Sequence, residues 1–420
     1  MRRSCWLPLV TLVAASCAPL SSTPSASPLV SPSASSSLSV SPSPTQAVPT
    51  AAEGASAAPA GPSIAWTSVA LAPFGSNRVW AVAAAKVGST IVVAANDATQ
   101  NDMKPVLIES PNGSNWTRVP TDGAEFANSR LDYLVPVPGG LLLVGESLTV
   151  DPSCAAAAAG CNQAPSAVLM WRSSDGMVWQ PLGARQINSF DRVWISSMAA
   201  GPAGLEASGL YDPPTAKPGT PEAVVLHSID GVNWSSRAFP DQNGGSTGVL
   251  NQGIIATANG FVAVGSGDMA TGAVGSAGAG AWYSPDGLAW TRAITPSTTS
   301  ASGLRYAAAG ARGMVATSYD PEGSNAWWVS VDGKTWQTPD TSPFTVGASW
   351  LAGDLHNILV ISGPSVYWSE DGRLWRRGDS APAMPSTGIV GATDLAWVFG
   401  STVIVVSPDD LSLYVGQVLE

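Results

Sequence analysis

A short motif recurs along this chain: Ser, any residue, Asp or Asn, Gly, any two residues, then Trp. The complete copies occupy residues 110–116, 173–179, 228–234, 284–290, 330–336 and 369–375. A seventh stretch, residues 407–413, starts in the same way but lacks the Gly and the Trp. One supersecondary unit repeated at a spacing of tens of residues predicts an array in which each unit packs on its neighbours.

The motif has the chemistry of a tight hairpin turn. Asp-Gly supplies the positive φ angles that such turns require, and the Asp and Ser oxygens can accept backbone N–H groups. We therefore expect the motif aspartates to be structural: Asp175, Asp230, Asp286, Asp332 and Asp371. The Trp that ends each motif is expected to pack between neighbouring units. The residue two positions before each Ser is always apolar and is expected to face the core: Ile108, Trp171, Leu226, Trp282, Trp328, Tyr367 and Val405.

Short strand patterns fill the chain between the turns. Gly-led apolar runs such as residues 140–145 and 260–265 alternate with variable loops and aromatic-rich runs, and no helical periodicity intervenes. Four short strands per unit predict an all-β fold, namely a seven-bladed β-propeller of four-stranded antiparallel blades, with six or eight blades as alternatives. Residues 64–71 look like an outer strand that could close the ring, and the tail, residues 411–419, competes for that place.

The turn motif resembles the Asp-box, or bacterial neuraminidase repeat, of sialidases and of many non-enzymatic β-propellers. In this chain Asp and Gly are adjacent, whereas the usual pattern places one residue between them. The resemblance implies that ligands bind on the face opposite the turns. A sialidase-like site would use Arg78, Arg192 and Arg305 for a sugar carboxylate, with Asp97, Glu206 and Tyr319 as catalytic candidates. The alternative for Glu206 is a strand position that faces solvent.

The first residues predict export and anchoring. Residues 1–17 have a basic start, a short apolar run and a small-residue site before Cys17, which resembles a lipoprotein signal peptide with Cys17 as the lipidation site. Residues 18–63 are almost entirely Ser, Pro, Ala, Thr, Val and Leu, and predict a disordered stalk that could hold the propeller, residues 64–420, on the order of 100 Å from the membrane. The alternative to lipidation of Cys17 is ordinary signal cleavage. Outside the cytoplasm we expect a disulfide between Cys154 and Cys161, and the alternative for these two cysteines is a metal site.

Composition narrows the possible partners. The net charge of −11 disfavours binding to nucleic acid. The sequence contains no convincing metal motif, phosphate-binding Gly loop or Ser/His/Asp arrangement, so we expect neither a metal nor a cofactor. We expect a monomer whose only membrane contact is the lipid anchor, on the periplasmic or outer side of a bacterial envelope.

Two sets of charged residues fall on the predicted ligand face. Arginines precede four inner strands and could bind a carboxylate, keep the surface soluble, or pair with Asp132 and Asp191: Arg78, Arg130, Arg192 and Arg305. Acids follow five Gly-led strands and could pair with the arginines, bind a hard cation, or merely begin polar loops: Asp97, Glu146, Asp212, Asp268 and Asp320.

These features give three functional hypotheses. The leading one is a non-catalytic head that binds a glycan or an envelope protein through the arginines and the loop carrying Cys154 and Cys161, because loops on a rigid scaffold commonly carry function. The second is a sialidase-like exo-glycosidase. The third is a structural or assembly role in the envelope, since fold alone does not define function.

Overall fold

The computed structural model describes residues 61–76, 78–99, 102–148, 168–182, 193–211, 222–238, 249–267, 279–296, 304–318, 327–339, 350–362, 364–381, 396–407 and 412–419. All of them belong to one unit of the chain, Ser56–Glu420. The predicted signal peptide with Cys17, the stalk up to residue 60, and Cys154 and Cys161 lie outside the described residues. No described helix is both long and apolar enough to cross a membrane.

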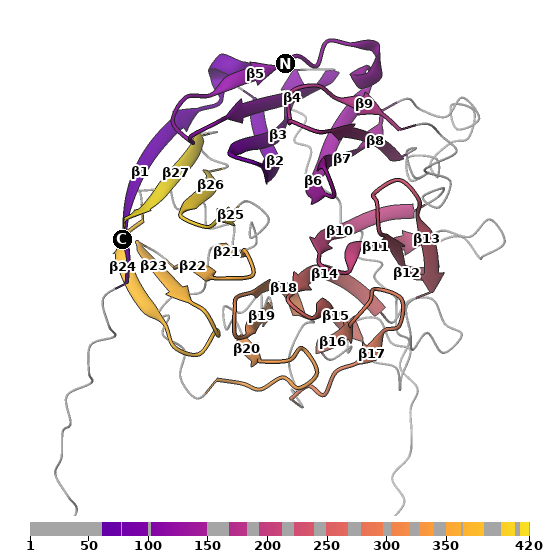
Figure 1. The fold of residues 1–420 in the computed structure, drawn as a ribbon, viewed down its shortest axis with the longest axis vertical. Coiled ribbons are helices and arrows are strands. Elements are labelled where there is room, and N and C mark those ends of the chain that lie inside the picture. The colour runs from indigo at the N-terminus through magenta and orange to yellow at the C-terminus, as the bar shows by residue number, and fades with distance from the viewer. Residues whose placement is uncertain are drawn as a thin grey trace, which may run out of the picture. The chain divides into compact units, whose positions relative to one another are not determined.

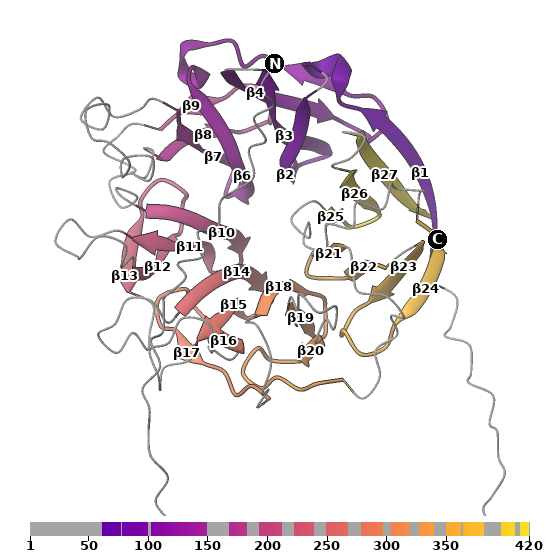
Figure 2. The same cartoon turned by 180° about the vertical axis from the view of Figure 1, so that it is seen from behind.

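Seven antiparallel sheets stand around a common centre and form a β-propeller (Figures 1 and 2). The innermost strands of blades 1 to 7 are β2 (Val79–Val87), β6 (Ser129–Val137), β10 (Val193–Gly201), β14 (Val249–Thr257), β18 (Leu304–Ala309), β21 (Trp350–Gly353) and β25 (Ala396–Phe399). The second strands are β3 (Thr90–Thr99), β7 (Gly140–Ser147), β11 (Gly204–Tyr211), β15 (Gly260–Gly267), β19 (Met314–Ser318), β22 (Ile358–Ser362) and β26 (Thr402–Ser407).

The third and outer strands complete the blades. The third strands are β4 (Asp102–Ser110), β8 (Val168–Ser173), β12 (Glu222–Ser228), β16 (Ala279–Ser284), β20 (Trp327–Ser330), β23 (Ser365–Ser369) and β27 (Ser412–Leu419). The outer strands are β5 (Thr117–Val119), β9 (Gln180–Pro181), β13 (Ser235–Ala238), β17 (Thr291–Arg292), β24 (Arg376–Ser380) and β1 (Ser63–Ala70). In blade 5 the place of a fourth strand is taken by the bridge between Val329 and Gln337. Two 3₁₀ turns, η1 (Ala72–Phe74) and η2 (Ala124–Phe126), lie between blades.

Blade 7 is assembled from both ends of the propeller. β1 pairs with β27 over its whole length, from Ser63 opposite Leu419 to Ala70 opposite Ser412, and Figure 1 shows the two strands side by side. This confirms that the segment near residues 64–71 is the closing outer strand, whereas the tail is the third strand. The sequence predicts that the propeller begins at residue 64, and its contacts begin slightly earlier: the N–H of Gly61 donates to the carbonyl of Arg377 at 2.6 Å. Closure leaves β27 without a free edge.

The seventh motif copy is not a turn of the same kind. The six complete motifs join third and outer strands, but residues 407–413 join the second and third strands of blade 7, with Ser407 opposite Ser412. This incomplete copy therefore connects a different pair of strands from the six complete motifs. The blade count is still seven, because the third and outer strands of blade 7 are joined by pairing between the chain's two ends instead of by a turn.

The six complete turns share one hydrogen-bond pattern, so the aspartates are structural as predicted. One carboxylate oxygen accepts the N–H groups two and three residues ahead, for example those of Met177 and Val178 on Asp175 at 2.8 and 3.1 Å. The Trp indole N–H then donates to the turn Gly carbonyl, at 3.1 Å for Trp179 and Gly176. In blade 1, Asn112 makes the same bonds with its amide oxygen. Each turn Gly has a φ between 71° and 83°, which favours Gly.

The core consists of seven apolar layers, one between each pair of adjacent blades. The layer between blades 1 and 2 contains Val92, Leu141 and Trp171, and the layer between blades 7 and 1 contains Ile91 and Ile404. Four motif tryptophans are buried in such layers, as the sequence predicted: Trp179, Trp234, Trp336 and Trp375. Of the residues two before each Ser, six are buried, whereas Tyr367 is half-buried. Stability therefore resides in contacts between neighbouring blades.

The antiparallel strand order defines two faces of the ring. The hairpins between first and second strands and the six motif turns lie at one end of the strands, which we call the turn face. The entries to the inner strands and the loops between second and third strands lie at the other end, which we call the loop face. The sequence placed the variable loops on the face opposite the turns, and the topology agrees.

Candidate functional site

The inner strands share an irregularity near the loop face. In blades 1 to 5 the register with the second strand shifts by one residue, which is a β-bulge. The bulged residues are Val82, Asp132, Ser196, Gln252 and Arg305. Bulges re-aim side chains and are common beside functional sites. The side chains of Gln252 and Arg305 lie outside the described part of the structure, whereas the other three line the centre of the ring.

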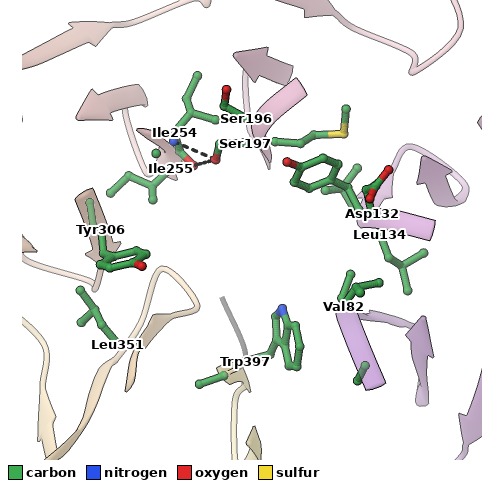
Figure 3. A pocket seen from close by; sticks show the side chains of 18 of the residues that line it. Val82, Asp132, Leu134, Ser196, Ser197, Ile254, Ile255, Tyr306, Leu351 and Trp397 are labelled. Atoms are coloured by element: carbon green, nitrogen blue, oxygen red, sulfur yellow. Dashed lines mark hydrogen bonds between the residues drawn. The ribbon is translucent and has the colours of Figure 1, made fainter. Parts of the chain in front are cut away.

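A cavity of about 450 Å³ occupies this centre. Inner strands of all seven blades contribute to its wall, and Figure 3 shows their side chains around a common space. Four aromatic residues stand among them: Trp80, Tyr133, Tyr306 and Trp397. All four are half-buried, so part of each side chain remains accessible. The volume is within the range of small-molecule pockets, about 300 to 1,000 Å³.

Polar side chains fix neighbouring inner strands to one another at the cavity wall. Ser197 Oγ of blade 3 accepts the N–H of Ile254 of blade 4 at 3.0 Å (Figure 3). The hydroxyl of Tyr133 of blade 2 donates to the carbonyl of Ile195 of blade 3 at 3.1 Å. The wall between blades 2 and 4 is therefore held by hydrogen bonds as well as by packing. Ser196, beside Ser197, is exposed at the same wall.

A charged cluster stands at the blade 2 side of the cavity. Arg130 Nε lies 3.2 Å from Asp132 Oδ1, and Arg130 Nη2 lies 3.0 Å from Glu146 Oε2. Asp132 lines the cavity and Glu146 does not. Burial raises the pKa of Asp132 to about 6; Arg130 opposes this shift and the charge of Glu146 adds to it. A carboxyl group with a perturbed pKa in a cavity is a functional-site candidate.

The structure describes the side chains of two of the four predicted arginines, Arg78 and Arg130, and their surroundings differ. Arg130 is paired with Asp132 and Glu146, and the sequence had offered pairing with Asp132 as an alternative to a ligand role. Arg78 is exposed just before β2, on the loop face. Arg192 and the side chain of Arg305 lie outside the described residues, so the convergence of all four arginines remains a prediction.

Asp97 holds a loop in place. Its carboxylate accepts the N–H of Ser76 at 2.8 Å and also contacts the Ser76 hydroxyl. This fixes the segment that leads through Arg78 into β2. Of the other acids that follow second strands, Glu146 pairs with Arg130, and Asp212, Asp268 and Asp320 lie outside the described residues.

Asp97 and Glu206, two of the sialidase-like candidates, lie at opposite ends of their strands. Asp97 is near the loop-face end of β3, whereas Glu206 follows the hairpin at the turn-face start of β11. They are thus not brought together to act on one bond. Tyr319 lies outside the described residues. The alternative that Glu206 faces solvent was wrong, because its exposed fraction is 0%.

Glu206 is buried with His227 between blades 3 and 4. Its Oε1 atom lies 2.5 Å from Nδ1 of His227. Burial raises the pKa of Glu206 to about 9, the charge of Asp286 adds to the shift, and Arg237 opposes it. Burial also lowers the pKa of His227. The pair is therefore uncharged at neutral pH, with the Glu206 proton donated to His227.

Sequence reasoning did not identify the aromatic cavity wall or Asp132 as site residues. The bulge inserts one residue into the inner strands of blades 1 to 5 and breaks the two-residue alternation that shows which side chains face inward. A repeated break in alternation a few residues into these strands is the signal that could have revealed the site. No group of His, Cys, Asp and Glu residues within the described ranges is arranged to hold a metal ion.

Comparison with known proteins identifies no family. The chain matches no protein-family model and no curated protein. Among solved structures it is similar to a protein of unknown function from Dyadobacter fermentans DSM 18053, with 14% identity, a TM-score of 0.44, and coverage of 85% of this chain and 100% of that one. It is also similar to the Aleuria aurantia lectin in complex with alpha-methyl-L-fucoside, with 15% identity, a TM-score of 0.40, and coverage of 74% and 97%.

A glycosyl hydrolase from Bacteroides ovatus is a further match, with 11% identity, a TM-score of 0.31, and coverage of 64% of this chain and 88% of that one. The structural neighbours thus include both a lectin and a hydrolase. At these identities and TM-scores they bear on neither the ligand nor the chemistry of this chain. The class that its own coordinates define is a seven-bladed β-propeller with a central cavity.

Proposed function

We propose that this chain is a non-catalytic glycan-binding β-propeller that takes its ligand into the loop-face end of the central cavity. The observation that carries the proposal is the cavity wall, which combines four half-buried aromatic residues with one carboxylate and exposed Ser196. Sugars present apolar C–H faces, which pack on aromatic rings, and hydroxyl groups, which bind carboxylates and serines. The same wall is too concave and small to receive a folded protein partner.

Export and anchoring complete the proposal. A head carried on residues 18–63 and tethered through lipidated Cys17 would present its cavity to glycans of the envelope or its surroundings. Metabolic labelling with an alkyne fatty acid tests this: wild type should be labelled and remain with membranes, whereas Cys17→Ser should be unlabelled and released. Labelling that persists in C17S would contradict the anchor without affecting the proposed ligand.

Binding is tested with a glycan array followed by calorimetry on the strongest hits. Trp397→Ala should weaken binding at least tenfold, because it removes an aromatic face from the cavity. Trp397→Phe should retain part of the affinity. The control is Leu374→Ala, which changes an exposed apolar residue in a motif turn on the turn face and should have no effect. Binding that survives W397A and the matching Trp80→Ala unchanged would remove the cavity from the account.

A glycoside hydrolase is the second candidate, because Asp132 is a cavity carboxyl group whose pKa is raised and could serve as a general acid. Hydrolysis normally requires two carboxyl groups that flank the bond. Among the described lining residues Asp132 is the only acid, which favours binding over catalysis. Turnover of fluorogenic glycosides, a sialoside included, that Asp132→Asn abolishes would reverse this preference.

A further inference from the structure

The described side chains of the cavity wall carry a single negative charge, whereas the sequence predicted arginines on this face. Among its described lining residues there is no Arg, Lys or His, and Asp132 is the one charged group. Arg130 stands behind Asp132 and contacts two carboxylates, those of Asp132 and Glu146. One guanidinium against two carboxylates leaves this cluster with a net charge of about −1 when all three are ionised.

The aromatic residues give the same preference. Tyr306 and Trp397 line the same space as Asp132 (Figure 3), and Trp80 is a further lining residue. The faces of Trp and Tyr rings carry negative electrostatic potential and attract ammonium groups within about 6 Å. The whole chain carries a net charge of −11, which adds a long-range attraction for cations. Rings, carboxylate and net charge therefore all favour a positively charged group on the ligand.

We infer that the ligand is a glycan bearing a free amino group, whose ammonium lies beside Asp132 and whose sugar faces pack on the aromatic wall. This inference rests on the proposed function and names its ligand class. Asp132 supplies a charge-assisted hydrogen bond. Trp80, Tyr306 and Trp397 supply apolar contact to the sugar faces. A carboxylate-bearing sugar would meet the same cluster with repulsion.

The acid-base behaviour of Asp132 adds a regulatory consequence. The pKa of the free carboxyl group is about 6, so its charge is lost as the pH falls below that value. Binding of an amino sugar should therefore weaken by up to tenfold per pH unit below pH 6. Binding of the matching neutral sugar should change much less over the same range.

The experiment compares two sugars that differ in charge and acetylation alone. The glucosamine trimer and the N-acetylglucosamine trimer are titrated by calorimetry into the full chain at pH 7 and pH 5. The amine-bearing trimer should bind at least tenfold more tightly at pH 7, and this preference should shrink at pH 5. Asp132→Asn should remove the preference, whereas Asp122→Asn, which deletes a carboxylate that is 91% exposed, should leave it intact.

The outcomes separate the inference from the function on which it rests. Equal or tighter binding of the neutral trimer, or preference for a sialylated or uronic acid oligomer, overturns the amino-sugar inference and leaves glycan binding standing. A preference for the amine that survives D132N in a variant of unchanged thermal stability also overturns it. Failure of every sugar on the array to bind removes the proposed function itself.

Discussion

The Glu206 carboxyl group lies directly beneath the turn glycine of the next blade, Gly287: a Cβ added to that glycine would overlap Glu206 Oε1. Three other turn glycines cover the equivalent residue of the preceding blade in the same way, and there it is Val92, Val262 or Val315; in blade 3 a Cβ at Gly231 would contact Val137 and the equivalent Leu142. Glu206 thus replaces an apolar residue in a repeated contact between blades. The apolar layer at this interface has seven buried members. The hydrogen-bonded pair of Glu206 and His227 takes a place that hydrophobic contacts fill at other interfaces.

Glu206→Gln should stabilise the protein at alkaline pH. The folded-state pKa of about 9 exceeds the ordinary glutamate value of 4.5. The stability that Glu206 contributes is therefore fully present below pH 4.5 and is lost as the pH rises towards 9. Above pH 7 His227 is mostly neutral in both states, because its ordinary pKa is 6.5 and burial lowers it further in the folded protein. The gain in unfolding free energy from E206Q should grow by on the order of 1 kcal/mol per unit between pH 7 and 8.5.

Thermal or urea unfolding at several pH values measures this gain. Glu109→Gln is the matched control, because Glu109 stands in the third strand of blade 1 and its carboxylate accepts the hydroxyl of Thr117 in the same blade at 2.5 Å. A difference between E206Q and wild type that stays constant from pH 7 to 8.5 would show that Glu206 is not held as the neutral acid.

Asp230→Ala should cost about 1–2 kcal/mol of stability at neutral pH, because it leaves turn N–H groups without their acceptor. Those of Val232 and Asn233 both lie 2.8 Å from Asp230 Oδ1. Asp230→Asn should cost much less, since Asn112 fills the same role in blade 1. Equal losses for the two variants would mean that the charge, and not the acceptor oxygen, stabilises the turn.

The pH dependence of wild type against D230N gives the turn a second test. Burial would raise the pKa of Asp230, but the N–H groups of Asn233 and Val232 hold it at about 2. Its contribution is therefore present above the ordinary aspartate value of 3.8 and is lost as the pH falls towards 2. The advantage of wild type over D230N in acid unfolding should shrink across that window. An advantage that is unchanged between pH 4 and pH 2 would contradict the assignment.

Ring closure is tested by two truncations. Removal of residues 1–60 should leave the unfolding temperature unchanged. Removal of residues 1–70 deletes β1 and exposes β27 as a free edge, so it should lower the unfolding temperature by several degrees and promote association. Calorimetry and light scattering measure the two effects. Identical behaviour of the two truncated chains would mean that β1 does not close the propeller.

Much of the fold was accessible from the sequence because it depends on local rules that repeat. The turns at Asp175 and Gly176 follow from Asp-Gly chemistry, and Trp171 two residues before the Ser faces the core as its position predicts. The place of residues 407–413 in the blade could not be predicted, because a short match without Gly and Trp does not show which strands it joins. The count of seven blades followed from the turns only in part, since blade 7 is completed by pairing of the two ends.

The site was less predictable, because it depends on where side chains of different blades meet. The sequence offered pairing with acids as one role for Arg130 and ligand binding as another, but it could not show that Asp132 and Glu146 would both reach the guanidinium. The contact made by Asn96 was equally unpredictable from the sequence. Its side-chain amide donates to the carbonyl of Leu131 and accepts the N–H of Leu131, both at 2.8 Å, and so joins blades 1 and 2. No local pattern specifies such contacts between units.

A crystal structure of the propeller with the glucosamine trimer tests the central claim most directly. The account predicts sugar density inside the cavity, stacked on Trp80 or Trp397, with an amino group within hydrogen-bond distance of the Asp132 carboxylate. Sugar bound on the turn face or the outer rim, with the central cavity filled by water alone at saturating ligand, would contradict it.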